Sequence, residues 1–314
     1  MDSKVIKIGT RGSALALAQT ELVISAVKRC NPDACIEKVI IKTKGDKEAD
    51  KPVASFGGKG VFITEIEEAL SCGKIDMAVH SAKDLPASLS EGLHIPSVLE
   101  RQDARDVFIT RAETSYIDLF QKEHPVVGTG SLRRQFQLQS HHQQYINFKH
   151  IRGNVPTRLE KLRNREYDGI ILAAAGLKRL GLEAEKDFEY KYFDIEEMVP
   201  AAGQGIIAIE TRKEDCTSGG SYISSILKDI TDYNTFIHYC NERKIMEALH
   251  AGCHEAIGII SYYYNNNRNI CIKLIRETGS ARGVVSSYNG KGSIDDMEEL
   301  VSAAIEHGRG GCQT

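Results

Sequence analysis

The chain of 314 residues is predicted to be an α/β protein with two α/β lobes and a smaller C-terminal α+β domain. Strand-like apolar segments alternate with segments of helical periodicity over the first two-thirds of the chain. This alternation restarts near residue 100, and the last third changes to a helix, a hairpin and a closing helix. With 41% hydrophobic and 26% charged residues, the chain can bury several cores, and its length favours two or three domains.

The alternating elements predict parallel sheets that are covered by helices on both faces. We expect strands at residues 5–8, 36–42, 75–79, 106–109, 126–128, 147–151 and 169–174. We expect helices at residues 13–29, 64–71, 131–140, 157–164 and 175–180, with Ser13 as a possible N-cap of the first. A cleft between two such lobes is a common place for a ligand site.

The last third begins after a break rich in Gly and Ser at residues 217–221. We expect a helix at 233–249, a hairpin of strands at 257–264 and 270–276, a third strand at 284–288 and a closing helix at 295–307. The expected domains are therefore residues 1–101 with 202–220, residues 102–201, and residues 221–314.

Composition excludes several classes of function. The net charge of −3 gives no general case for nucleic-acid binding, and no apolar run approaches the roughly 18 residues that a membrane span needs. The N-terminal residues lack the apolar stretch of a signal peptide, so we expect a cytoplasmic protein or one whose targeting segment has been removed. The eight cysteines form no CxxC pair, which favours reduced thiols. His250, Cys253 and His254 lie close together, but without a second ligand cluster we expect no metal.

One acid stands out by its position. The run HSAKDLP follows the apolar segment 75–79 directly, which places Lys83 and Asp84 at the carboxyl end of a strand. Open α/β sheets bind ligands at such ends, and a partly shielded carboxylate there can donate and accept protons near neutrality. The alternative is a turn aspartate that caps a helix or pairs with Lys83, and position alone favours that alternative.

Basic residues recur just after predicted strands, beside small residues that expose backbone N–H groups. They are Arg11 in GTRGS, Arg133 and Arg134 in GTGSLRRQ, Arg152 and Arg158 in RGNVPTR, and Lys178 and Arg179 in AAAGLKRL. Arginine binds carboxylates bidentately, so this recurrence suggests a substrate with several carboxylates or phosphates. The glycine runs GTRGS and FGGKG match neither a P-loop nor a dinucleotide fingerprint.

Two loops also carry candidate function. Residues 43–60 form a long, charged and glycine-rich connection, and connections of this length are usually lids or disordered. Cys253 lies in LHAGCHEAIG, between the expected long helix and a strand. A thiol in such a loop can be reactive, although an unreactive, half-buried cysteine is the usual case.

Taken together, these segments resemble the porphobilinogen deaminase (hydroxymethylbilane synthase) family of tetrapyrrole biosynthesis. The matching runs are IGTRGSALALAQ, KTKGD, FGGKGVF, IDMAVHSAKDLP, VGTGSLRRQ, IRGNVPTRL, YDGIILAAAGLKRLGL, PAAGQG and AGCHEAIG. They follow the family order over essentially the full length, and HSAKDLP and GTGSLRRQ are the most specific of them.

The resemblance implies two lobes like those of periplasmic binding proteins and a third domain that carries a covalent dipyrromethane, joined to Cys253 by a thioether. The implied enzyme is a transferase of heme biosynthesis. It condenses four porphobilinogen molecules with loss of ammonia and releases hydroxymethylbilane. The family further implies a cytoplasmic monomer that binds this small-molecule substrate and neither nucleic acid nor membrane.

The resemblance also assigns residue roles. Asp84 is the implied catalytic carboxylate, and residues 43–60 are the implied lid. The implied cofactor-binding residues are Cys253, Lys83, Ser131, Arg133, Arg134, Arg158 and Lys59. The implied substrate-binding residues are Arg11, Ser13, Arg152, Arg179 and Gln204.

The chain departs from the family pattern around its cofactor cysteine. The run before Cys253 is LHAGC, where the family commonly has an acid and two glycines, and His254 and Glu255 replace a glutamine and an apolar residue. The tail GRGGCQT looks more like the usual motif, but Cys312 follows the closing helix at a chain end, where order is poor. We therefore expect attachment at Cys253. The rival functions are a two-lobed binding protein without catalysis and a transferase or ligase of a phosphorylated substrate.

Overall fold

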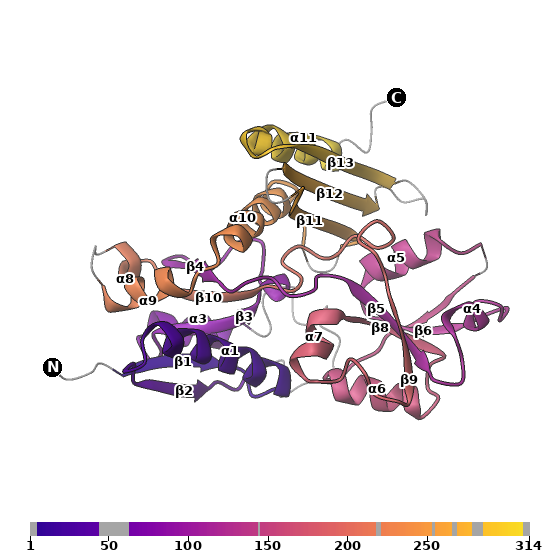
Figure 1. Ribbon diagram of the computed structural model, residues 1–314, viewed down its shortest axis with the longest axis horizontal. Coiled ribbons are helices and arrows are strands. Elements are labelled where there is room, and N and C mark those ends of the chain that lie inside the picture. The colour runs from indigo at the N-terminus through magenta and orange to yellow at the C-terminus, as the bar shows by residue number, and fades with distance from the viewer. Residues whose placement is uncertain are drawn as a thin grey trace. The chain divides into compact units, whose positions relative to one another are not determined.

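The computed structural model describes residues 5–43, 63–143, 145–217, 221–252, 255–265, 269–277 and 285–309. Its contacts divide the chain into a first unit, Met1–Gln102 with Ile206–Phe236, and a second unit, Asp103–Gly205 with Ile237–Thr314. The first unit contains a five-stranded sheet, and the second contains a five-stranded and a three-stranded sheet (Figure 1). Two α/β lobes and a smaller α+β part are therefore present, as predicted. The finer division into three domains stays a prediction.

The sheet of the first unit has the strand order β2-β1-β3-β10-β4. Its strands are β1 (Ile6–Thr10), β2 (Ile36–Ile40), β3 (Met77–Ser81), β4 (Leu93–Val98) and β10 (Ile207–Arg212). Strand β1 runs parallel to β2 and β3, as predicted, whereas β10 runs antiparallel to β3 and β4. The prediction of parallel strands therefore holds for part of this sheet only, because β10 enters it after the chain has passed through the second unit, and no local pattern encodes such a return.

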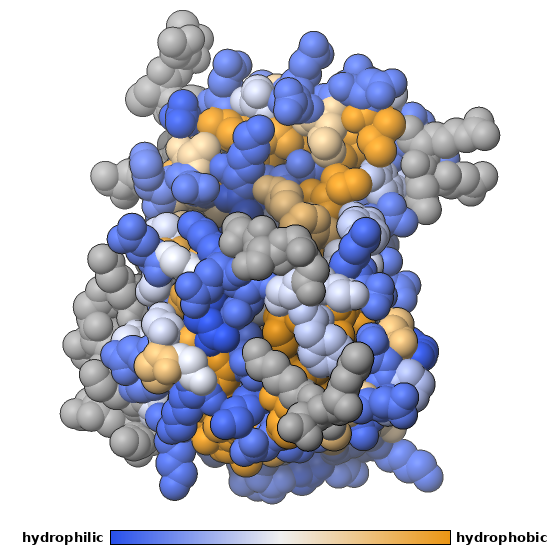
Figure 2. All heavy atoms as spheres, turned by 90° about the vertical axis from the view of Figure 1, so that its left-hand side faces the viewer, coloured by the Kyte–Doolittle hydropathy of each residue, from blue (hydrophilic) through white to orange (hydrophobic). Residues whose placement is uncertain are grey.

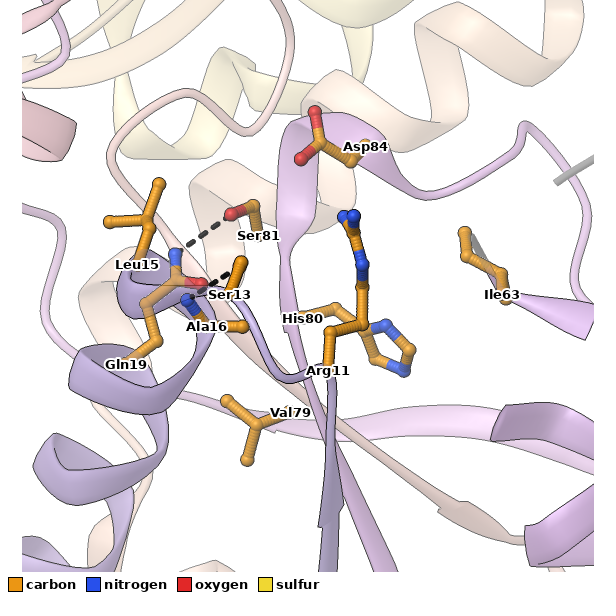
Figure 3. A pocket seen from close by; sticks show the side chains of 10 residues that line it. All are labelled: Arg11, Ser13, Leu15, Ala16, Gln19, Ile63, Val79, His80, Ser81 and Asp84. Carbon is orange, nitrogen blue, oxygen red and sulfur yellow. Dashed lines mark hydrogen bonds between the residues drawn. The ribbon is translucent and has the colours of Figure 1, made fainter. Parts of the chain in front are cut away.

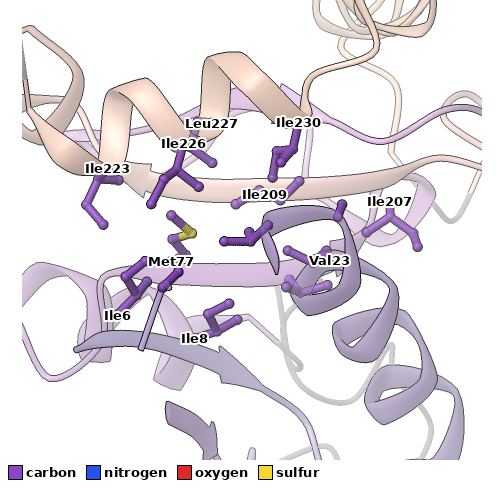
Figure 4. Close-up of a cluster of buried hydrophobic side chains, with 14 residues drawn as sticks. Ile6, Ile8, Val23, Met77, Ile207, Ile209, Ile223, Ile226, Leu227 and Ile230 are labelled. Carbon is purple, nitrogen blue, oxygen red and sulfur yellow. The ribbon is translucent and has the colours of Figure 1, made fainter. Parts of the chain in front are cut away.

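Helices cover both faces of this sheet, as parallel strands require. The helices of the first unit are α1 (Ala14–Cys30), α3 (Thr64–Ser71), α8 (Glu214–Thr217) and α9 (Tyr222–Ile230). Figure 4 shows the core on one face, where Val23 of α1 and Ile226 of α9 pack with Met77 and Ile209 of the sheet. On the other face, Ile66 of α3 packs in a separate cluster. Helix α9 falls within the expected C-terminal domain, yet its apolar side is buried in the first unit.

The second five-stranded sheet has the order β7-β6-β8-β5-β9. Its strands are β5 (Asp106–Arg111), β6 (Val126–Gly128), β7 (Asn147–Lys149), β8 (Gly169–Ala173) and β9 (Phe188–Tyr192). Strand β6 is parallel to β7 and β8, but β5 is antiparallel to β8 and β9, so here too the prediction of parallel strands holds for part of the sheet only. The edge strand β9 was not predicted, because only Phe188 is buried and the rest of the strand is polar or half-exposed.

Side chains of β5 alternate between two cores, which explains why the strand is buried throughout. The helices around it are α4 (Tyr116–Leu119), α5 (Leu132–Ser140), α6 (Val155–Arg163) and α7 (Ala174–Arg179). Val107 and Ile109 pack with Leu159 of α6 and Leu177 of α7. Phe108 points the other way, toward Leu119 of α4 and Leu138 of α5.

The remaining part of the second unit is the antiparallel sheet β11-β12-β13 with two long helices. Its elements are α10 (Tyr233–Ala248), β11 (Ile257–Tyr264), β12 (Asn269–Glu277), β13 (Val285–Ser293), η3 (Ile294–Asp296) and α11 (Met297–Arg309). The predicted hairpin of β11 and β12 is confirmed. Helices α10 and α11 contribute Ile245, Val301 and Ala304 to a core with Ile259 and Leu274 of the sheet.

The surface is charged, with isolated apolar residues. Figure 2 shows one side of the molecule, where hydrophilic residues predominate between smaller hydrophobic areas. Large exposed apolar side chains, such as Leu22, Ile40 and Tyr222, come from different elements. Within the described ranges, no helix combines the length and apolar character that a membrane crossing demands.

Candidate active site

A pocket in the first unit lies where β1 and β3 end. These strands are parallel, with Gly9 opposite Ala78, so their carboxyl ends meet at one edge of the sheet. Ser13 then caps α1 by accepting a hydrogen bond from the Ala16 N–H at 3.3 Å, which confirms its predicted capping role. The residues lining the pocket are Arg11, Ser13, Leu15, Ala16, Gln19, Ile63, Val79, His80, Ser81 and Asp84.

Asp84 ends a short 3-10 helix, η2 (Ala82–Asp84), directly after β3. This turn is fixed by the buried Ala82, whose N–H donates to the Ile206 carbonyl at 3.0 Å, and by the buried Leu85, whose N–H donates to the Ala82 carbonyl at 3.2 Å. Asp84 itself is exposed. An anchored backbone thus presents a solvent-accessible acid, and Figure 3 shows the Arg11 guanidinium pointing toward it.

Two polar pairs hold the end of β3, which forms part of this pocket. The Gln19 amide of α1 donates to the Ser81 hydroxyl at 2.7 Å, and this bond links α1 to the end of β3 (Figure 3). His80 Nε2 lies 2.9 Å from Glu210 Oε2 of β10, and both side chains are buried. These supporting residues were not predicted. His80 and Ser81 could have been inferred from the run HSAKDLP, whereas Glu210 becomes their neighbour only through the antiparallel pairing of β10 with β3.

A buried carboxylate organises the corresponding edge of the second unit. Asp106 is 0% exposed and accepts hydrogen bonds from Arg133 at 2.6 Å, from Arg134 at 2.7 and 2.9 Å, and from Gln204 at 3.0 Å. Burial alone would raise the pKa of Asp106, but the two guanidinium charges and the hydrogen bonds of Arg133 and Gln204 hold it well below its ordinary range.

The same two arginines also bind backbone carbonyls. Arg133 donates to Val199 O at 2.8 Å, and Arg134 donates to Ile171 O at 2.9 Å. Both residues are buried and both were predicted to hold carboxylates of a ligand. In this structure their carboxylate partner is Asp106, a residue that no local pattern places beside them.

Arg152 follows β7, and Arg158 lies on the next helix, α6. The Nε of Arg158 donates to the Gly153 carbonyl at 2.8 Å, and Asn154 caps α6 by accepting from the Thr157 N–H at 2.9 Å. Partial burial and the positive charges of Arg152 and Arg158 lower the pKa of the adjacent His150. The two guanidinium groups give this turn positive charge, which suits an anionic group.

Ser131 and Arg179 lie at the ends of helices in the second unit. Ser131 occupies the N-cap position of α5 without a side-chain capping bond, and its N–H donates to Thr129 Oγ1 at 3.2 Å. Arg179, the last residue of α7, donates to the Gly205 carbonyl at 2.7 Å. Gln204 also donates to the Ala104 carbonyl at 2.7 Å, so Arg179 and Gln204 are held at one turn.

Some predicted residues fall outside the described part of the chain. They are Lys59, Cys253, His254, Cys312 and residues 44–60 of the expected lid. Among the described residues, no three His, Cys, Asp or Glu side chains are grouped to hold a metal ion. Because Cys253 and His254 are not among them, the expectation of no metal stays a prediction, as does the cleft between the lobes.

The residues that flank positions 253 and 254 are well anchored. Leu249 and Ala251 are buried in the core of the three-stranded sheet, and the Glu255 N–H donates to the Gly252 carbonyl at 3.1 Å. The Glu255 carboxylate accepts a hydrogen bond from Arg276 of β12 at 2.9 Å. The departure at Glu255 is therefore accommodated by an ion pair with β12. The described residues on either side of positions 253 and 254 follow α10 and precede β11.

The fold and these residues define an α/β protein whose strand ends present arginines and an exposed acid, a pattern suited to a ligand with several carboxylates. Residues 6–218 match the family model described as "Porphobilinogen deaminase, dipyromethane cofactor binding domain". The chain belongs to the porphobilinogen deaminase family. Its members are transferases of heme biosynthesis that polymerise porphobilinogen on a dipyrromethane cofactor.

Curated relatives named porphobilinogen deaminase span most of the chain. The relative from Clostridium novyi is 39% identical over 298 residues, covering 94% of this chain and 95% of its own length. The relative from Lachnospira eligens is 44% identical and covers 80% of this chain and 82% of its own length. The one from Bacillus subtilis is 42% identical, with 80% and 76% covered.

Solved structures show a weaker likeness. The second substrate binding domain of a putative amino acid ABC transporter from Streptococcus pneumoniae has a TM-score of 0.43 and 13% identity, with 72% of this chain and 92% of that chain covered. The BenM effector binding domain has a TM-score of 0.42 and 15% identity, with 72% and 90% covered. Neither likeness carries an argument about function.

Proposed function

We propose that this chain condenses four porphobilinogen molecules head to tail, with loss of ammonia, on a dipyrromethane primer attached through Cys253, and that it releases hydroxymethylbilane. The observation that carries this proposal is the exposed carboxylate of Asp84. It is presented by an anchored turn beside Arg11, in a chain of this family. A two-lobed binding protein would need no such acid.

Asp84 is proposed to move one proton in each condensation. Its carboxyl group gives a proton to the leaving aminomethyl nitrogen, and the carbon–nitrogen bond breaks to release ammonia. The methylene carbon that lost ammonia then bonds to the free α-carbon of the terminal pyrrole of the growing chain. The proton displaced from this α-carbon returns to Asp84. One group can act as both acid and base because each round leaves its protonation unchanged. After the fourth round, the carbon–carbon bond between the tetrapyrrole and the primer breaks, and water supplies the hydroxyl group to the tetrapyrrole and a proton to the primer carbon. The exposure of Asp84 is compatible with repeated access by new substrate molecules.

The arginines are proposed to hold the acetate and propionate arms. Guanidinium groups match carboxylates geometrically, and two of them are held by hydrogen bonds to backbone carbonyls, Arg158 to Gly153 and Arg179 to Gly205. Arg11 and Ser13 belong to the Asp84 pocket. The residues proposed for substrate or cofactor arms are Arg11, Ser13, Lys59, Lys83, Ser131, Arg152, Arg158, Arg179 and Gln204.

Arg133 and Arg134 differ from the other candidate arginines because each is bonded to the buried Asp106 carboxylate. Their buried bonds to Asp106 mean that contact with a cofactor carboxylate would require a change of partner or an additional one. Their proposed contact with the cofactor therefore stays a prediction. Their bonds to Asp106 already give them a structural part in shaping this edge of the sheet.

The described residues fit a dipyrromethane cofactor. The flanks of Cys253 are anchored by Ala251 and Glu255. Arginines that suit carboxylate arms, such as Arg11, Arg158 and Arg179, are present in the part of the chain that the structure describes. When bound, the cofactor supplies the first nucleophilic pyrrole carbon and tethers the growing product. The chain's own residues then hold the arms and move the proton. We further propose three domains, with 221–314 carrying the cofactor, residues 43–60 as a lid, and a cytoplasmic monomer that does not bind nucleic acid.

The intact mass of the purified protein tests this proposal most directly. The mass is expected to exceed that of the sequence by two linked pyrrole units. Cys253→Ser is expected to remove this increment, because the thioether has no sulfur to form on. Cys312→Ser is the matched control and is expected to keep it. An active wild-type protein without the increment would overturn the proposal, as would an increment that follows Cys312.

A further inference from the structure

The turn at residues 201–205, with the sequence AAGQG, has an uncommon backbone conformation. Gly203 and Gly205 have φ angles of +72° and +86°, in the left-handed region that favours glycine. Gln204 between them is 1% exposed. The turn is therefore buried in an uncommon conformation, and its N–H and carbonyl groups need partners inside the protein.

Glu242 of α10 supplies one of these partners. Its side chain is buried, with 0% exposed, although glutamate is rarely buried in a helix. One carboxylate oxygen accepts a hydrogen bond from the Gly203 N–H at 2.6 Å, and the other accepts from the Ser261 N–H of β11 at 2.8 Å. These two hydrogen bonds tie the turn to α10 and β11.

The next residues of the turn contact predicted site residues. The Gln204 amide donates to Asp106, which holds Arg133 and Arg134, and the Gly205 carbonyl accepts from Arg179. A shift of Gly203 would therefore be transmitted to Gln204 and Gly205 over one or two residues. The hydrogen bonds of Gly205 and Gln204 orient Arg179 and the cluster of Asp106, Arg133 and Arg134.

We infer that Glu242 is a positioning residue for the condensation reaction. It acts without touching substrate, by fixing the turn that contains Gln204 and whose Gly205 carbonyl accepts a hydrogen bond from Arg179. Helix α10, which carries Glu242, ends at Ala248, five residues before Cys253, so one helix supports both the turn and the cofactor loop. This inference rests on the proposed function, because it assigns Arg179 and Gln204 to the binding of carboxylate arms.

Steady-state kinetics of the Glu242→Gln holoenzyme test the inference. Glutamine keeps the shape and one acceptor oxygen, but it turns an NH2 group toward a backbone N–H. We expect KM for porphobilinogen to rise about tenfold, the size of one lost hydrogen bond in the positioning network, with kcat changed less. Glu247→Gln on the exposed side of the same helix removes the same charge and is expected to leave both constants unchanged.

A cycle with Arg179→Ala separates positioning from general stability. If Glu242 acts through Arg179, the rise in KM for the double variant will be smaller than the product of the two single effects. A merely structural role predicts less folded protein with an unchanged KM, or effects that multiply, and either result would overturn the inference.

If Glu242→Gln does not fold, Glu242→Asp takes its place. The shorter side chain keeps the charge but cannot reach both N–H groups, so the same KM effect is expected and an unchanged KM would refute it. The wild-type mass increment is measured in parallel. Its absence would refute the proposed function, whereas its presence with normal Glu242 variants would refute only the inference.

Discussion

Asp84 and Asp106 lie at comparable edges of the two five-stranded sheets, but they have opposite surroundings. Asp84 follows the end of β3 and is exposed beside the half-buried Arg11. Asp106 begins β5, which is antiparallel to β8, so it lies opposite Ala173 at the end of that strand. It is fully buried and shared by Arg133 and Arg134. Asp84 in the first unit is thus accessible to a ligand, whereas Asp106 in the second unit is bound by two buried arginines.

The difference teaches that burial and pairing decide what a strand-end acid can do. A paired, buried carboxylate is costly to protonate, which makes it a good structural anchor and a poor proton carrier. An exposed carboxylate on a rigid turn can exchange protons with a ligand. Each of the following changes tests one side of this comparison.

The largest effect is expected for Asp84→Asn. Turnover of porphobilinogen should fall by about 10²–10⁴-fold, because the amide cannot pass a proton, while substrate binding is retained. Measurement of kcat and of substrate binding by the same variant checks this. Asp33→Asn, an exposed aspartate of the same unit, serves as the control. Near-normal turnover of the Asp84 variant would exclude this residue as the acid.

Asp106→Asn should instead reduce stability. Two buried guanidinium groups lose their counter-charge, and breaking a buried ion pair in this way costs about 3–5 kcal/mol. Denaturant unfolding of the variant and the wild type measures the difference. A loss below about 1 kcal/mol would show that the cluster is not the anchor that its geometry indicates.

A pair of conservative changes compares the arginines themselves. Arg133→Lys should cost about 1–3 kcal/mol of stability, because lysine cannot reproduce the bonds to both Asp106 and Val199. Arg11→Lys should cost less than about 1 kcal/mol but raise KM, since Arg11 lines the Asp84 pocket. Thermal unfolding and steady-state kinetics on both variants decide the matter. The reverse pattern would contradict the comparison.

The smallest effect is expected from pH. Because the pKa of Asp106 is lowered in the folded state, its stabilisation is fully present above the unfolded pKa of about 3.9 and is lost as pH falls through the lower, folded value. The stability gap between the wild type and Asp106→Asn should therefore be constant from about pH 8 to 5 and narrow below about pH 4. A gap that widens on acidification would be inconsistent with the lowered pKa.

Sequence patterns predicted the elements with strong local signals. The helix α1 with its Ser13 cap, the buried strands β3 and β8, and the hairpin of β11 and β12 are all confirmed. The edge strand β4, which contains Pro96, lacked the usual strand pattern and was missed. The returning strand β10 was also missed, because it pairs with residues more than 100 positions away.

The sequence by itself determined the fold class, the family and the position of Asp84 at the end of a strand, because motif spacing and apolar periodicity are local properties of the chain. Only the tertiary structure decided which charges face each other. It paired Arg133 and Arg134 with Asp106, set His80 against Glu210, and brought Glu242 to Gly203. These partners are separated by 27 or more positions in the chain, and their pairing depends on strand order and direction, which no local pattern specifies.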